Sequence, residues 1–143
     1  MSIWKKIMAK CDRRIKSLTS SCKNIYGIGI DIVRIDRFIN LREQFIKKIF
    51  LPDEFFYAQQ RSISSLAGIF SAKEAVAKSL GTGFKKISPI EIMIRHNTNN
   101  KPFVELLSRA SKIALSRKIC EIKISITHEK KYAIAIAVAI YKI

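Results

Sequence analysis

The 143-residue sequence has few of the residues that build metal or disulfide scaffolds. Its three cysteines are odd in number and show no C-x-x-C spacing, so neither a disulfide framework nor a zinc knuckle is indicated. The two histidines lie far apart and form no H-E-x-x-H zinc motif. This cysteine content favours a reducing, cytoplasmic location.

Long apolar runs are also missing. The longest extends from Ala133 to Tyr141 and is too short to cross a bilayer. The N-terminus lacks the continuous apolar region of a secretory signal. We therefore expect no stable membrane insertion.

Acidic residues are scarce, with 11 Asp and Glu against 27 Lys and Arg, which gives a formal net charge of +16. Such a surface attracts polyanions, among them nucleic acid, anionic lipid, phosphorylated cofactors and acidic proteins, and charge alone does not choose between them. The length and the 48% hydrophobic content suit one compact domain with a core and are too small for two.

Residues 1–24 differ from the rest, with seven basic residues and one acid. Their apolar residues recur at helical spacing, which predicts a small amphipathic helix or a frayed extension. An organelle transit peptide and a basic membrane-surface helix are the alternatives.

Residues 25–143 form the predicted domain, and its patterns alternate between strand and helix. Glycines 81 and 83 end a long helix that Ser64 or Ser65 could cap. The last strand is apolar on both faces, with isoleucines and valine on one and alanines on the other, so we expect both faces to be covered. The expected elements are a strand at 25–31, helices at 34–49, 53–60 and 64–80, strands at 89–95 and 103–107, a helix at 108–118, and a hairpin of strands at 121–127 and 131–141. This order predicts an α+β fold, a single domain with an antiparallel sheet packed on a long helix.

Several nucleotide-binding motifs are excluded. Gly27-x-Gly29 has Ile32 where a dinucleotide fingerprint needs its third glycine. Gly81-Thr82-Gly83 is not followed by the Gly-Lys-Ser/Thr of a P-loop, and no nucleophile elbow is present.

Two carboxylates stand out because each lies in an apolar segment, where an unpaired charge is costly. Asp31 ends the first strand pattern, and Glu74 lies on the long helix with Lys78 one turn later. Together they suit a magnesium ion, which takes one or two carboxylates, with the lysine beside a substrate phosphate. The ordinary alternatives are a Glu–Lys helix pair and, for Asp31, a helix cap or a turn residue.

Other basic side chains give weaker indications of a function. His128 lies at the tip of the predicted hairpin, where a histidine is usually a surface residue, although it could help to hold a phosphate. Arg34, Arg37 and Arg42 fall on the first predicted helix and form either a solvated face or a docking surface for an acidic partner.

The motifs together resemble the bacterial holo-acyl-carrier-protein synthases, the short trimeric type of the 4′-phosphopantetheinyl transferase superfamily. The likeness covers residues 25–143 and is carried by four blocks. They are Tyr-Gly-Ile-Gly-Ile-Asp-Ile-Val-x-Ile-x-Arg at 26–37, Leu-Ala-Gly-Ile-Phe-Ser-Ala-Lys-Glu-Ala at 66–75 with Lys78 and Gly-Thr-Gly at 81–83, Lys-Pro at 101–102, and Ser-Ile-Thr-His at 125–128 followed by Tyr-Ala at 132–133.

The resemblance implies transfer of the phosphopantetheine arm of coenzyme A to a serine of apo acyl carrier protein, with magnesium and with active sites between subunits of a trimer. Asp31 and Glu74 would bind the metal, and these two with Lys78 would be the catalytic residues. Arg37 matches an arginine of the family's carrier-docking helix, and we expect the acidic carrier protein to dock on it together with Arg34 and Arg42. Coenzyme A would contact Lys78, Arg61, Gly81, Pro102, Ser125, Thr127 and His128.

This sequence departs from the family pattern in places. Ile69 replaces the usual arginine of the second block, and we expect Arg61 or a nearby lysine to compensate. Asn100 replaces the usual glycine before Lys101, and residues 1–24 have no counterpart in the family.

A basic RNA- or DNA-binding module would explain the charge but not the two acids in apolar segments. A transferase of the same superfamily that serves a polyketide or peptide synthase is another alternative.

Overall fold

A computed structural model of the chain describes residues 24–142. The N-terminal extension proposed for residues 1–24 therefore lies almost wholly outside the described residues. The elements in chain order are β1 (Asn24–Arg34), the 3₁₀ helix η1 (Ile35–Phe38), α2 (Glu43–Ile49), α3 (Pro52–Gln59), α4 (Ile63–Ser79), η2 (Gly83–Lys85), η3 (Pro89–Glu91), β2 (Ile92–His96), β3 (Pro102–Leu106), α5 (Ser108–Ser116), β4 (Ile119–His128) and β5 (Tyr132–Tyr141).

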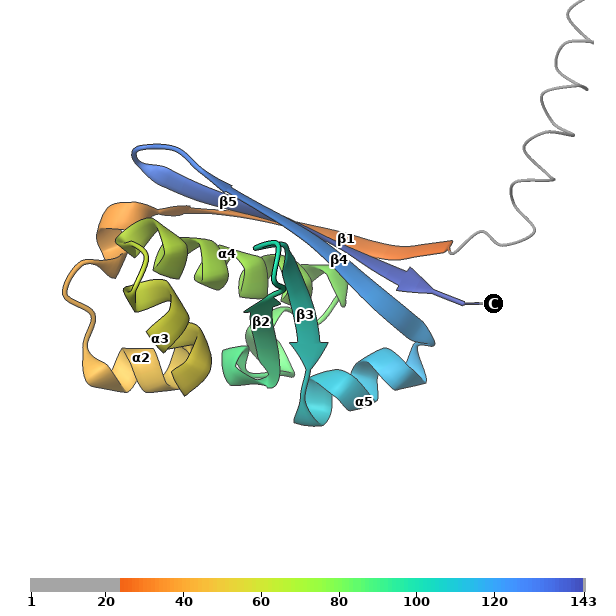
Figure 1. Ribbon diagram of the computed structural model, residues 1–143. Helices are drawn as coiled ribbons and strands as arrows, with labels where there is room; N and C mark the ends of the chain where they lie inside the picture. The colour runs from red at the N-terminus through yellow and green to blue at the C-terminus, as the bar shows by residue number, and fades with distance from the viewer. Residues whose placement is uncertain (1–23, 143) are drawn as a thin grey trace, which may run out of the picture.

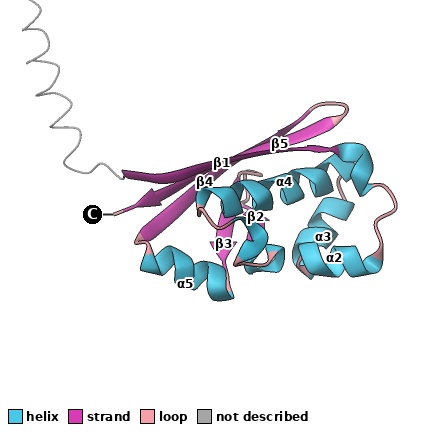
Figure 2. Ribbon diagram, turned by 180° about the vertical axis from the view of Figure 1, so that it is seen from behind, coloured by secondary structure: helices cyan, strands magenta, loops and turns pink. Residues whose placement is uncertain are grey.

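The architecture is the expected α+β domain. Three long antiparallel strands form a sheet in the order β1-β5-β4, and β2 and β3 form a separate hairpin. Figures 1 and 2 show that the helices and this hairpin all lie on one side of the three-stranded sheet, with α4 directly beneath it. No element within residues 24–142 covers the opposite side of the sheet (Figures 1 and 2).

Small residues bring α4 close to the sheet. Ala133, Ala135, Ala137 and Ala139 of β5 are buried on the α4 side. A Cβ at Gly29 would lie 1.8 Å from the carbonyl oxygen of Ala75, a distance at which atoms overlap. The close approach of β1 to the second half of α4 therefore requires glycine there.

The outward face of the sheet is apolar and exposed. Ile28, Ile30 and Ile32 of β1 are 60%, 62% and 59% exposed, and Ile136 of β5 is 41% exposed beside them. Among the described residues the expected burial of the first strand is therefore wrong, and no described element covers the outward face of the last strand (Figure 1). A contiguous apolar face of this kind marks an interaction surface.

Several predicted boundaries were wrong. The helix expected at 34–49 is two short helices, η1 and α2, separated by a turn in which Asn40 has a φ of 56°. Asparagine tolerates this left-handed conformation better than most residues, and a continuous helix cannot pass through it. The strand expected from Pro89 begins at Ile92 after the turn of η3, and the hydroxyl that caps α4 belongs to Ser62, which accepts a bond from the amide of Ser65.

A buried ion pair fixes α4 to its neighbours. The ammonium of Lys73 is fully buried and lies 2.7 Å from Oε2 of Glu54 on α3. It also donates to the carbonyl oxygens of Pro89 and Ile92, at 3.0 and 2.7 Å. Burial lowers the pKa of Lys73 despite the opposing charge of Glu54. One side chain thus joins α4 to α3 and to the start of β2.

Candidate active site

The structure brings together the two carboxylates and the lysine of the sequence hypothesis. Asp31 lies inside β1, three residues before its end, so its expected position at the end of the strand was wrong and it caps no helix. The ammonium of Lys78 lies 3.0 Å from Oδ1 of Asp31 and donates to the carbonyl oxygen of Ile30, also at 3.0 Å. The hydroxyl of Ser71 donates to the carbonyl oxygen of Asp31 at 2.9 Å. Asp31 is thereby held against α4.

Glu74 completes this group from the helix. Its pKa is raised, first by burial and then by the negative charge of Asp31, and the Lys78 ammonium opposes the shift only in part. Lys78 forms its ion pair with Asp31, although its charge also acts on the Glu74 carboxyl one turn earlier. Two partly desolvated carboxylates that repel one another form a site that a cation would stabilise.

The side-chain ligands available at this site suit a magnesium ion. Within residues 24–142 no group of three or more His, Cys, Asp or Glu side chains is placed to hold a metal. Magnesium commonly takes only one or two protein carboxylates and fills its remaining positions with water and phosphate oxygens. Asp31 and Glu74 fit that pattern.

A cavity of about 240 Å³ lies on a different side of α4. Arg61, Pro102 and His128, three of the residues expected to contact coenzyme A, line it. The rest of its wall is formed by Tyr57, Ser64, Ser65, Gly68, Ile69, His96, Asn100 and Ile126. Sequence reasoning noted Ile69 and Asn100 only as departures from the family pattern, and it missed Tyr57 and His96, because β2 and α3 approach each other only in the tertiary structure.

Other predicted contact residues lie elsewhere. Ser125 and Thr127 are exposed on β4 and do not line the cavity, to which this segment contributes Ile126 and His128. Gly81 follows α4 with a φ of 73°, near the guanidinium of Arg117, which donates to the carbonyl oxygen of Leu80.

The three arginines of the predicted docking surface do not share one helix. Arg34 ends β1 and pairs with Asp36, Arg37 belongs to η1, and Arg42 immediately precedes α2. Arg37 and Arg42 form no ion pair with any other described residue. They are exposed cations beside the end of β1 that carries Asp31.

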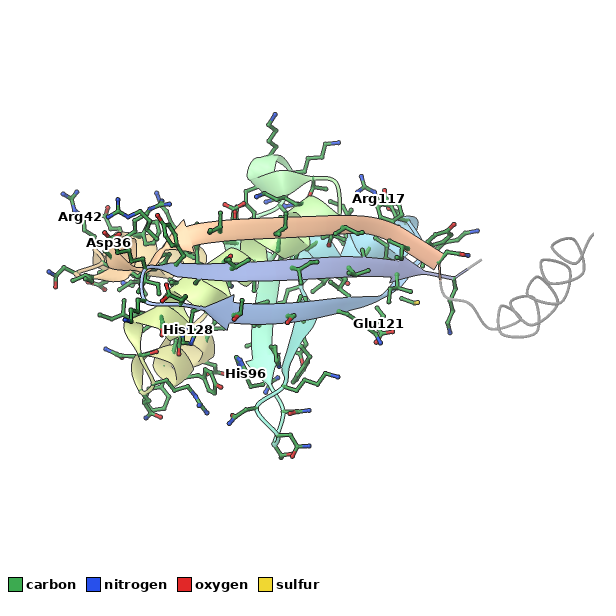
Figure 3. The ribbon with its side chains drawn as sticks, turned by 90° about the horizontal axis from the view of Figure 1, so that it is seen from above. Asp36, Arg42, His96, Arg117, Glu121 and His128 are labelled. Atoms are coloured by element: carbon green, nitrogen blue, oxygen red, sulfur yellow. The ribbon has the colours of Figure 1, made fainter. Side chains whose placement is uncertain are left out.

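The carboxylate group and most of the cavity lie on different sides of α4. At 3.6 residues per turn, Lys78 is about 40° from Glu74 around α4, whereas the cavity-lining Ser64, Gly68, Ile69 and Ser65 are about 80°, 120°, 140° and 180° away. Asp31 belongs to β1, and His128 to β4, with β5 between these strands. Figure 3, seen from the uncovered side of the sheet, shows His96 and His128 on the β4 side and Arg42 and Arg117 on the β1 side.

Comparison with known proteins identifies the family of the chain. The family described as the 4′-phosphopantetheinyl transferase superfamily matches residues 27–137. The chain belongs to this superfamily. Its curated relatives include the holo-[acyl-carrier-protein] synthase of Caldicellulosiruptor saccharolyticus, which is 42% identical over 123 residues, 80% of this transferase and 96% of the relative. The family assignment favours the transferase hypothesis over the nucleic-acid-binding module.

Solved structures agree with the fold. The acyl carrier protein synthase of Plasmodium yoelii with ADP bound matches this transferase with a TM-score of 0.77 and 31% identity, covering 86% of this chain and 100% of that one. The holo-[acyl-carrier-protein] synthase of Helicobacter pylori in complex with coenzyme A matches with a TM-score of 0.70 and 32% identity, covering 78% and 98%. Among the described residues of this transferase, no helix has the length and apolar character needed to cross a membrane.

Proposed function

We propose that Asp31 and Glu74 hold a magnesium ion, and that the active site is completed by the cavity of a neighbouring copy. The enzyme transfers the 4′-phosphopantetheine group of coenzyme A to a serine of apo acyl carrier protein and releases adenosine 3′,5′-bisphosphate. The serine oxygen bonds to the phosphorus that carries pantetheine, and the bond from that phosphorus to the bridging oxygen breaks.

The residues of the carboxylate group suit this displacement. When bound, magnesium would offset the negative charge of the diphosphate and of the departing bisphosphate. Lys78 places a further cation at the same point and stabilises charge that grows on the leaving oxygen. One of the two carboxylates accepts the proton of the serine hydroxyl. Much of the catalytic effect comes from holding these groups in place.

The cavity provides the nucleotide end of the substrate site. Arg61 and His128 supply positive or hydrogen-bonding groups for phosphate, and Pro102 and Ile126 supply apolar walls for a nucleoside. Ser64 and Ser65 add hydroxyl groups at the start of α4, where the helix dipole favours an anion.

The carboxylate group is the metal half-site and the cavity is the nucleotide half-site. Their placement supports a closed ring of subunits. Since they lie on different sides of α4, the carboxylates of one copy can meet the cavity of the next in a head-to-tail contact, and repeating such a contact closes a ring if the rotation allows. The exposed isoleucines of β1 and β5 provide apolar surface for that assembly. We propose the trimer that the family resemblance implies.

The carrier protein docks beside the carboxylates. Arg34, Arg37 and Arg42 lie on the β1 side, and their positive charge complements an acidic partner and would accelerate its association. The proposal places the reaction in the cytoplasm, where the free thiol of Cys120 would stay reduced.

Complementation between two inactive variants tests the shared site. Glu74→Ala removes the metal half-site and Arg61→Glu reverses charge in the nucleotide half-site. When the two are co-expressed in equal amounts, an intact site forms wherever the metal half of an Arg61→Glu copy meets the cavity of a Glu74→Ala copy. Random assembly of such rings gives about a quarter of the wild-type sites.

The assay measures the mass gain of apo carrier protein with coenzyme A and magnesium. Glu74→Ala co-expressed with the double variant Glu74→Ala/Arg61→Glu is the control, and it should stay inactive because no intact metal half exists. If the first mixture also stays inactive while native mass spectrometry shows mixed oligomers, the site lies within one chain and the shared-site proposal fails.

A further inference from the structure

A stack of three side chains forms one wall of the cavity. The guanidinium carbon of Arg61 lies 4.3 Å from the centre of the Tyr57 ring. The ring of His96 lies on Tyr57 with 4.3 Å between ring centroids and an interplanar angle of 14°. Tyr57 comes from α3, Arg61 from the turn after it, and His96 from the end of β2. All three border the cavity.

Arg61 has a second tether. Its Nη2 donates to Oδ1 of Asn100 at 3.0 Å, in the turn between β2 and β3. Among residues 24–142 it forms no ion pair with a carboxylate. The guanidinium is therefore fixed by a ring and an amide, neither of which neutralises its charge, and the charge is available to a bound anion.

This arrangement lowers the entropic cost of binding an anionic ligand. A free arginine side chain has many rotamers, and ordering it on binding weakens affinity. Here the stack and the amide order it before the ligand arrives. His96 also packs on the Tyr57 ring, and burial followed by the charge of Arg61 lowers the pKa of His96, which favours the neutral imidazole.

We propose that Tyr57 is a positioning residue for coenzyme A: its ring fixes the Arg61 guanidinium at the nucleotide cavity and so increases affinity for coenzyme A without changing the rate of transfer. The inference rests on the proposed function, because it assigns the cavity to coenzyme A. Tyr57 acts through Arg61, so its effect should disappear when Arg61 is absent.

A substitution series at Tyr57 tests this, with coenzyme A binding measured by calorimetry and KM and kcat by the mass assay. Tyr57→Phe keeps the ring and should bind within twofold of the wild type. Tyr57→Leu removes the aromatic face and should weaken binding about tenfold, which is about 1.4 kcal/mol, with kcat changed less than twofold. Tyr57→His should be intermediate and provides the comparison if the leucine variant does not fold.

Two controls separate positioning from general damage. Phe56→Leu alters the neighbouring ring of α3, which is 62% exposed, and should leave binding unchanged. In an Arg61→Gln background, Tyr57→Leu should add less than a twofold further loss. A tenfold further loss in that background, or equal losses for the phenylalanine and leucine variants, would overturn the inference. Failure of the wild type to bind coenzyme A would overturn both this inference and the proposed function, whereas wild-type binding that Tyr57→Leu leaves unchanged would overturn this inference alone.

Discussion

The buried pair of Lys73 and Glu54 allows a sharp test of the fold. Lys73→Met keeps the length of the side chain and removes its charge. Glu54 would then keep its two backbone donors, the amides of Leu51 and Ile94 at 2.8 and 2.6 Å, but would lose its cation. Breaking a buried pair by removing one partner costs about 3–5 kcal/mol. For a domain of this size that lowers the melting temperature by roughly 12–20 °C.

Urea unfolding followed by circular dichroism measures the loss directly. The matched control is Lys47→Met, which breaks an exposed pair with Glu43 of similar length, 2.6 Å, and should cost no more than about 0.5 kcal/mol. The double variant Glu54→Gln/Lys73→Met removes the uncompensated charge, but the glutamine NH2 then faces one of the two backbone donors, so it should recover only about 1 kcal/mol of the loss. The reasoning is refuted if Lys73→Met costs less than about 1 kcal/mol, or if the double variant is no more stable than the single one.

Two further predictions concern the active site. Glu74→Gln should abolish transfer. In the absence of divalent cations it should also raise the melting temperature, and more so at pH 8 than at pH 5. The reason is that the pKa of Glu74 is raised in the folded state, so its ionisation destabilises the folded protein as the pH rises from the unfolded pKa through the folded pKa. Equal melting temperatures for wild type and variant at pH 8 would contradict this. Arg37→Glu should raise KM for the carrier protein more than KM for coenzyme A, and less so at high salt, while Lys112→Glu on the distant α5 should change neither. Equal effects of Arg37→Glu on both substrates would remove its docking role.

The local pattern of the sequence predicted most of the elements. Apolar spacing identified α3, α4, β3, α5 and the β4–β5 hairpin, because these periods reflect which side of each element is buried. It also singled out Asp31 and Glu74, since a carboxylate in an apolar segment indicates a partner or a ligand. The break at Asn40 was missed because the apolar residues keep one helical period across it.

What the sequence determined by itself was the set of elements, the family motifs and the chemistry of the paired carboxylates, since all of these follow from neighbouring residues along the chain. The tertiary structure alone decided which side chains meet. It pairs Lys78 with Asp31 rather than with Glu74, stacks Tyr57 between Arg61 and His96, and places the two half-sites on different sides of α4. The contacts of Lys78 with Asp31 and of Tyr57 with His96 join residues 47 and 39 positions apart, and their geometry depends on how the elements pack, which no local propensity records.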